Sequence, residues 1–241
     1  MNSELILLDI FSYSCMNCLR SLEYIKKLDL NYRRFGLKTI IIHPPEWKFE
    51  KNRNNVLYAC KKHKINMPVI MDKDRKMINK LKINFWPTQI LVRNGKILYT
   101  HVGEGNYKKL EGLIIKNLKV KGKKIFLNEP KYSKFPTLYC GKKKWKSIKI
   151  GKWIQKNECI QSTKNDAKIT IKTKGNVTNF VAESLTKKPV LVKIMMNNEF
   201  NKNIKINKPR LYKLIKTNSS KTHRLTIISP KNLAIYSFSF Q

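Results

Sequence analysis

The sequence is short of acidic residues and of long apolar runs. Of its 241 residues only 15 are Asp or Glu, against 51 Lys or Arg, so the formal net charge is +36. No apolar run approaches the ~18 residues of a membrane-spanning helix, and the first residues lack the pattern of a signal peptide. Five cysteines are too few for a disulfide-rich scaffold. From these absences we expect no transmembrane helix and no disulfide-stapled fold, and the missing signal peptide by itself favours a cytoplasmic location.

The basic excess is compatible with nucleic acid, an anionic membrane or an acidic partner. However, the sequence contains 43 Lys, 24 Asn and 28 Ile but only 8 Arg and 4 Ala. Drift toward A/T-rich codons would produce this bias, whereas a surface selected for phosphate would favour Arg. We therefore favour codon drift as the source of the charge and do not expect nucleic acid as a partner. Residues 1–120 carry 23 basic and 10 acidic residues, and residues 121–241 carry 28 and 5.

The first half alternates short apolar runs with segments of helical periodicity. Residues 5–11 are suited to a buried strand, and Ser14 can cap a helix from near Cys15 to about Phe35. Further strands are predicted at 37–43, 68–71, 89–93 and 96–101, and further helices at 52–64, 74–81 and 107–118. Strands separated by helices pair in parallel, and Asn94-Gly95 signals a type I′ hairpin. This order predicts a thioredoxin-like α/β domain over residues 1–120.

A CxxC, Cys15-Met16-Asn17-Cys18, stands at the start of the first predicted helix. A helix N-terminus stabilises a thiolate, so Cys15 is the predicted attacking thiolate and Cys18 the thiol that resolves the mixed disulfide. The same spacing is half of a zinc site, but there is no second CxxC and the four histidines show no ligand spacing. The context of strand, CxxC and helix favours redox chemistry, with no metal and no cofactor beyond the Cys15–Cys18 disulfide.

Two residues outside the CxxC fit this chemistry. Asp9 lies in the apolar strand, where burial should raise the pKa of its carboxyl and allow it to accept the proton of Cys18. The alternative is a strand-end Asp bonded to backbone. Pro87 follows Trp86 and precedes a strand, and a cis Trp86–Pro87 bond would leave backbone groups free to pair with an incoming peptide.

Together these residues resemble the thioredoxin superfamily. LLDIFSYSCMNC is similar to its strand–Asp–CxxC start, and WPT is similar to its cis-proline turn. The segments IIIHPPEWKFE, MPVIMD, NFWPTQILVRNGKI and HVGEGNY resemble the TlpA/ResA-type branch, and most of all the soluble C-terminal portion of DipZ-type thiol-disulfide proteins. KPRLYKLI and AIYSFSF extend the resemblance into the second half. It implies a catalytic role for Cys15, Cys18 and Asp9, and the cis-proline role for Pro87.

The resemblance also implies finer roles. Glu46 lies near the acidic position that helps proton transfer in TlpA/ResA-type members, with a surface carboxylate as the alternative. Trp86 and Tyr13 are expected to line the substrate groove or to pack beside it. We expect protein thiols or disulfides as substrates and a separate electron donor, for which a membrane thiol carrier is the candidate. The resembled family works outside the cytoplasm, so the compartment stays open.

The second half is predicted to be β-rich. Residues 121–135 contain a basic run, a proline and no clear period, which indicates a linker. Apolar and polar residues then alternate at 167–172 and 234–240, with short apolar runs between. We expect an all-β, jelly-roll-like sandwich over residues 136–241, which the resemblance likens to a carbohydrate-binding module. The candidates for a sugar-stacking platform, or alternatively for core packing, are Tyr139, Trp145, Trp153 and Tyr212.

Three functions follow from these observations. The favoured one is a thiol-disulfide oxidoreductase that reduces protein disulfides through a mixed disulfide, with the basic sandwich directing it to an anionic surface or glycan. The second is a binding module for nucleic acid or anionic glycans in which the CxxC is structural. The third is a redox-regulated scaffold without turnover.

Overall fold

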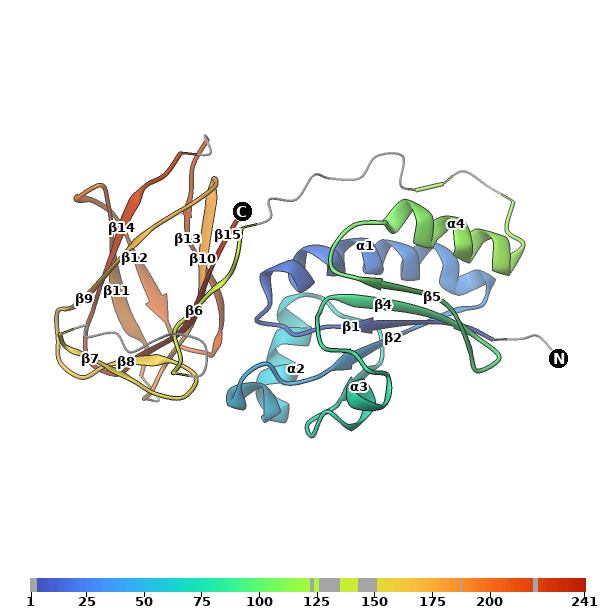
Figure 1. The fold of residues 1–241 in the computed structure, drawn as a ribbon, viewed down its shortest axis with the longest axis horizontal. Coiled ribbons are helices and arrows are strands. Elements are labelled where there is room, and N and C mark those ends of the chain that lie inside the picture. The colour runs from blue at the N-terminus through green and yellow to red at the C-terminus, as the bar shows by residue number, and fades with distance from the viewer. Residues whose placement is uncertain (1–3, 122–123, 126–134, 143–150, 187, 219–220) are drawn as a thin grey trace. The chain divides into compact units, whose positions relative to one another are not determined.

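The computed structural model describes residues 4–121, 124–125, 135–142, 151–186, 188–218 and 221–241. The chain divides into two units, Met1–Lys131 and Tyr132–Gln241, and both are drawn in Figure 1. The first unit is α/β and the second is all-β, so the predicted fold class is confirmed. Most of the predicted linker at 121–135 lies outside the described residues. In the described ranges, no helix is long and apolar enough to cross a membrane.

A five-stranded mixed sheet forms the centre of the first unit, in the order β3-β2-β1-β4-β5. Its strands are β1 (Leu5–Ile10), β2 (Leu37–His43), β3 (Val69–Met71), β4 (Thr88–Arg93) and β5 (Lys96–Val102). β1 runs parallel to β2 and antiparallel to β4, and β4 runs antiparallel to β5. Asn94 and Gly95 both have positive φ in the β4–β5 hairpin, as a type I′ turn requires.

Four helices cover this sheet, with α1 and α4 on one face and α2 and α3 on the other (Figure 1). They are α1 (Met16–Tyr32), α2 (Arg53–Lys62), α3 (Lys76–Lys80) and α4 (Tyr107–Leu118). α1 buries Leu22, Ile25 and Leu28, because residues three and four apart share one helix face. It ends in a 3-10 turn (Arg33–Phe35) followed by Gly36, whose φ of +102° is a conformation that glycine adopts without steric cost.

The strand directions bring four connections to one edge of the sheet. The C-terminal ends of β1, β2, β3 and β5 lie at this edge together with the N-terminal end of β4, because β4 alone runs the other way. Four of the connections at this edge are residues 11–15, 44–52, 84–87 and 103–106. The CxxC, Glu46 and Pro87 are therefore neighbours in space although they are distant in the sequence.

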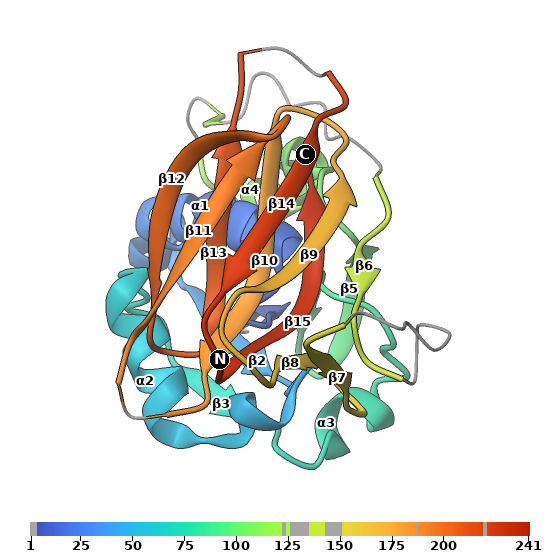
Figure 2. The same cartoon turned by 90° about the vertical axis from the view of Figure 1, so that its left-hand side faces the viewer.

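The second unit is built from two antiparallel sheets that share a core. Its strands are β6 (Leu138–Tyr139), β7 (Trp153–Gln155), β8 (Ile160–Ser162), β9 (Ala167–Lys172), β10 (Val177–Ser184), β11 (Val190–Met196), β12 (Glu199–Ile206), β13 (Arg210–Lys216), β14 (Arg224–Ser229) and β15 (Leu233–Phe240). One sheet has the order β13-β10-β15-β8-β7, with β6 beside β15, and the other has the order β12-β11-β14-β9. In Figure 2 the β12-β11-β14-β9 sheet lies nearer the viewer, over the other sheet.

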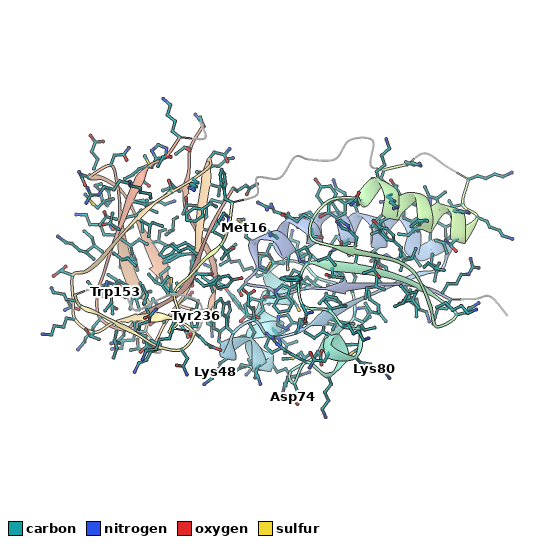
Figure 3. All side chains as sticks on the ribbon, in the orientation of Figure 1. Met16, Lys48, Asp74, Lys80, Trp153 and Tyr236 are labelled. Carbon is teal, nitrogen blue, oxygen red and sulfur yellow. The ribbon has the colours of Figure 1, made fainter. Side chains whose placement is uncertain are left out.

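Alternate residues of both sheets point into the shared core. Ile194 and Leu225 contribute from one sheet, and Phe180 from the other. Trp153, labelled in Figure 3, and Tyr212 are also buried in this core. Core packing therefore accounts for these two of the four candidate aromatics; Tyr139 is half-buried and Trp145 lies outside the described residues.

Candidate active site

The CxxC begins α1 at the edge where the four connections meet. Cys15 is the N-cap residue of α1, and its Sγ accepts a hydrogen bond from the backbone N–H of Cys18 at 3.3 Å. The first N–H groups of a helix have no acceptor within the helix, so this one is free to stabilise a thiolate at Cys15. Cys15 is half-buried, Cys18 is fully buried, and both are free thiols. Figure 3 labels Met16, which lies between them.

Asp9, on β1, is buried within electrostatic reach of Cys18. Its Oδ1 accepts a hydrogen bond from Gln89 Nε2 at 3.0 Å, and the same amide donates to Ser21 Oγ at 3.1 Å. Burial raises the pKa of the Asp9 carboxyl to about 7, although the bond from Gln89 acts in the opposite direction. Its other oxygen, Oδ2, has no hydrogen-bond partner among the described residues. The carboxyl therefore titrates near neutral pH and has a free oxygen for a proton.

The pKa of Cys18 is raised well above its ordinary value, first by burial, then by Cys15, and to a smaller extent by Asp9. A thiol in this condition needs a base before it can attack a disulfide, because only the thiolate is nucleophilic. Asp9 is the carboxylate whose charge reaches Cys18. The arrangement can therefore move a proton from Cys18 to Asp9.

The Trp86–Pro87 peptide is cis and lies beside the first cysteine. The carbonyl oxygen of Trp86 is 4.0 Å from Cys15 Sγ. The Trp86 indole donates from Nε1 to Glu46 Oε2 at 3.2 Å, and the Arg75 guanidinium lies 5.4 Å from the centroid of its ring. Phe85, which precedes Trp86, is 71% exposed. The segment whose Trp86 carbonyl lies near the reactive sulfur thus carries an exposed aromatic ring and a half-buried indole.

Tyr13 occupies a different environment from Trp86. It is buried, and its ring stacks on that of His43 with 5.5 Å between the ring centroids. The structure thus places Tyr13 in the packing beside the site, which is the second of the two arrangements that the sequence allowed.

A buried glutamate that the sequence analysis did not single out, Glu50, holds the segment that precedes Cys15. Its Oε1 accepts hydrogen bonds from Ser12 Oγ at 2.8 Å, from Ser14 Oγ at 2.7 Å and from the Ser14 N–H at 3.2 Å. Its Oε2 accepts from the Glu46 N–H at 2.6 Å. Burial raises the pKa of this carboxyl in spite of the four donors. Glu50 thereby joins the CxxC segment to the connection after β2.

Glu46, the carboxylate that the resemblance selected, contacts the segment that holds Trp86. It is half-buried, and its side chain accepts the bond from Trp86. The acid that contacts the residues before Cys15 is Glu50. No local signal marks it, because it lies in a short 3-10 turn (Lys48–Lys51) whose two lysines are exposed.

The sheet edge therefore brings most of the predicted site residues together. The residues that meet there are Asp9, Cys15, Cys18, Glu46, Trp86 and Pro87. In the part of the chain that the structure describes, no group of three or more His, Cys, Asp or Glu side chains is arranged to hold a metal ion.

Comparisons with known proteins find two family matches and several relatives. Residues 3–114 match the Redoxin family, and residues 131–240 match the family described as a thioredoxin-like C-terminal domain. The chain is 27% identical over 139 residues to protein DipZ of Mycobacterium tuberculosis, covering 57% of this chain and 20% of DipZ. It is 25% identical over 112 residues to the thiol-disulfide oxidoreductase ResA of Bacillus cereus, covering 46% of this chain and 62% of ResA.

The solved structure of StoA from Bacillus subtilis aligns with a TM-score of 0.40 at 19% identity, covering 44% of this chain and 79% of StoA. The chain spans less than two thirds of the length of DipZ and of ResA. The two family matches follow one another along the chain, in the same order as the α/β and all-β units. The chain thus carries a Redoxin-family match followed by a match to the thioredoxin-like C-terminal domain family, and it is similar to TlpA/ResA-like and DipZ-like proteins of the thioredoxin superfamily.

Proposed function

We propose that this chain is a thiol-disulfide oxidoreductase that reduces protein disulfides by cycling Cys15 and Cys18 between dithiol and disulfide. The observation that carries the proposal is the paired geometry at the start of α1. Cys15 Sγ accepts a bond from the Cys18 N–H, and the buried Asp9 lies within electrostatic reach of Cys18. The similarity to ResA, a thiol-disulfide oxidoreductase, supports the same activity class.

In the first step, the Cys15 thiolate attacks one sulfur of a substrate disulfide. A bond forms between Cys15 and that sulfur, the substrate S–S bond breaks, and the second substrate sulfur leaves as a thiolate. Cys15 suits this step because its sulfur is half-buried beside the Trp86 carbonyl, whereas Cys18 is fully buried.

In the second step, Cys18 gives its proton to Asp9 and attacks the Cys15 sulfur. The Cys15–Cys18 disulfide forms, and the first substrate sulfur leaves as a thiolate. Two electrons have then passed from the dithiol to the substrate. A separate dithiol donor must reduce Cys15–Cys18 before the next cycle, and a membrane thiol carrier is our candidate for it.

The test is reduction of a protein disulfide, with insulin as substrate and dithiothreitol as donor. We expect Cys15→Ser to abolish the enzymatic rate and Cys18→Ser to accumulate a mixed disulfide that mass spectrometry detects. Cys60→Ser is the matched control, because Cys60 is a half-buried thiol on α2 outside the site, and it should keep the wild-type rate. Equal rates for Cys15→Ser and wild type would refute the proposal and favour the scaffold or the binding module.

The second unit supports an additional role in delivery. Its β12-β11-β14-β9 sheet exposes cations on strands that pair side by side: Lys172 lies opposite Arg224, and Lys193 lies on the strand next to β14. The exposed cations of these strands include Lys168, Lys172, Lys193, Lys205 and Arg224. We propose that this face favours acidic partners or an anionic surface or glycan.

Salt dependence tests the delivery role, because exposed charges are screened by added ions. Reduction of an acidic protein substrate should slow as salt is added, and reduction of a neutral one should not. Lys168→Glu with Lys193→Glu should remove the difference. Reduction rates that do not change with salt concentration for either substrate would refute the delivery role. Binding of single-stranded DNA in the same salt series would support the alternative function as a nucleic-acid-binding module, and absence of binding at low salt would refute that alternative.

A further inference from the structure

An ion pair links the N-terminal part of α1 to the connection after β5. Arg20 donates from Nε to Glu104 Oε1 at 2.7 Å and from Nη2 to Glu104 Oε2 at 2.5 Å. The same Nη2 donates to Asn17 Oδ1 at 2.8 Å. The pair is well shielded from solvent, since the Arg20 side chain is 16% exposed and that of Glu104 is 7% exposed. Arg20 thus bonds both Glu104 and Asn17 through one guanidinium group.

The two ends of this link lie at the CxxC turn and beside the Pro87 connection. Asn17 is one of the two residues between the cysteines. At the other end, Gly103, which precedes Glu104, donates its N–H to the Pro87 carbonyl at 2.8 Å. The contacts therefore run from the CxxC turn through Arg20 and Glu104 to the proline that lies next to Cys15.

The pair contributes more to geometry than to stability. Burial raises the pKa of the Glu104 carboxyl, and the hydrogen bonds and charge of Arg20 only partly oppose this. A shielded ion pair of this kind is weak evidence for stability, but a bidentate guanidinium–carboxylate contact fixes orientation. The pair Arg33–Asp29 at the C-terminal end of α1 differs in both respects, with one contact of 3.6 Å and an arginine that is 52% exposed.

We infer that Arg20 and Glu104 form a positioning pair for disulfide exchange. They hold Asn17, and with it the turn that carries Cys15, at a set position relative to the Pro87 connection, so that a protein disulfide beside residues 86 and 87 meets the Cys15 sulfur. This inference rests on the proposed function. Arg20 does not touch the reacting sulfurs in this scheme and acts through Asn17.

The test is Arg20→Lys, which keeps the positive charge but loses the bidentate guanidinium contact. Lys cannot reproduce the bidentate contact with Glu104 and the bond to Asn17 together. We therefore expect kcat/KM for insulin reduction to fall about ten- to a hundredfold, because small misplacements of reacting groups lower rates by about this much. Alkylation of Cys15 by iodoacetamide should stay within about twofold, because this small reagent needs no positioned substrate. Arg33→Lys is the matched control and should leave both rates unchanged.

A second variant separates positioning from folding. Asn17 is exposed, so Asn17→Ala should leave the thermal midpoint unchanged and lower kcat/KM as Arg20→Lys does. If Arg20 acts through Asn17, the double variant should be no slower than the slower single variant, because residues that act as one unit are not additive.

Three results would overturn the inference while leaving the proposed function standing. They are a wild-type kcat/KM in Arg20→Lys, a parallel loss of Cys15 alkylation, or fully additive losses in the double variant. A wild-type chain that reduces no insulin would instead refute the proposed function, and the inference would fall with it.

Discussion

Asp9→Asn tests the site most directly, because it replaces a buried acid with a neutral side chain of the same shape. Burial raises the pKa of Asp9 from 3.8 to about 7 in the folded chain. At a pH between these two pKa values, Asp9 is ionised in the unfolded chain and protonated in the folded chain. The free energy of unfolding therefore falls as pH rises through this window, by about 4 kcal/mol in total for a difference of about three pKa units. The asparagine variant has no such titration.

The measurement is urea unfolding of both proteins with a reductant present, from pH 4 to pH 8. Because the chain has two units, the probe must report on the first. Replacing Trp145 and Trp153 with Phe in both proteins leaves Trp47 and Trp86, which lie in the first unit. The free energy of unfolding of Asp9→Asn relative to the Asp9 protein should rise by about 4 kcal/mol from pH 4 to pH 8. Parallel pH curves for the two proteins would refute the argument.

The same variant should slow the second chemical step. Without the carboxylate, Cys18 loses its proton to water, and the missing general base should cost about a hundredfold in the rate of resolution. The mixed disulfide at Cys15 should accumulate at pH 7, and the rate should recover as pH rises toward the raised pKa of Cys18. Rapid mixing with a peptide disulfide, followed by acid quench and mass spectrometry, measures the intermediate. A wild-type resolution rate at pH 7 would remove Asp9 from the mechanism while leaving the stability argument intact.

Two other predictions concern buried polar groups near the site. Glu50→Gln places an amide N–H₂ against donors that now bond a carboxylate, so it should lower the free energy of unfolding by about 1–3 kcal/mol; a thermal scan that shows no shift would contradict this role. His43 is buried with a pKa lowered to about 4 by its burial, so the protein should lose about 3 kcal/mol of stability as pH falls from about 6.5 to 4, whereas His43→Phe should not. Equal acid sensitivity of the two proteins in urea unfolding would contradict the second prediction.

Local sequence patterns determined most of the first unit. The strand at Leu37–His43 and the helix at Tyr107–Leu118 have the predicted ends, because hydrophobic periodicity and turn residues act over a few neighbouring residues. The CxxC at a helix start also follows from local chemistry. The short strands β7 and β8 were not predicted, since three residues carry too little periodicity to stand out.

The burial of Asp9 could be predicted from the apolar residues on either side of it in β1. By contrast, only the tertiary structure decided which other charged groups serve the site. Glu46 and Glu50 share one connection, and their burial depends on Ser12, Ser14 and Trp86, which belong to other segments. Arg20 and Glu104 are 84 positions apart and meet because β5 ends at the edge where α1 begins. The sequence by itself thus determined the elements and the reactive cysteines, whereas desolvation and side-chain hydrogen bonds are set by groups that only the fold brings together.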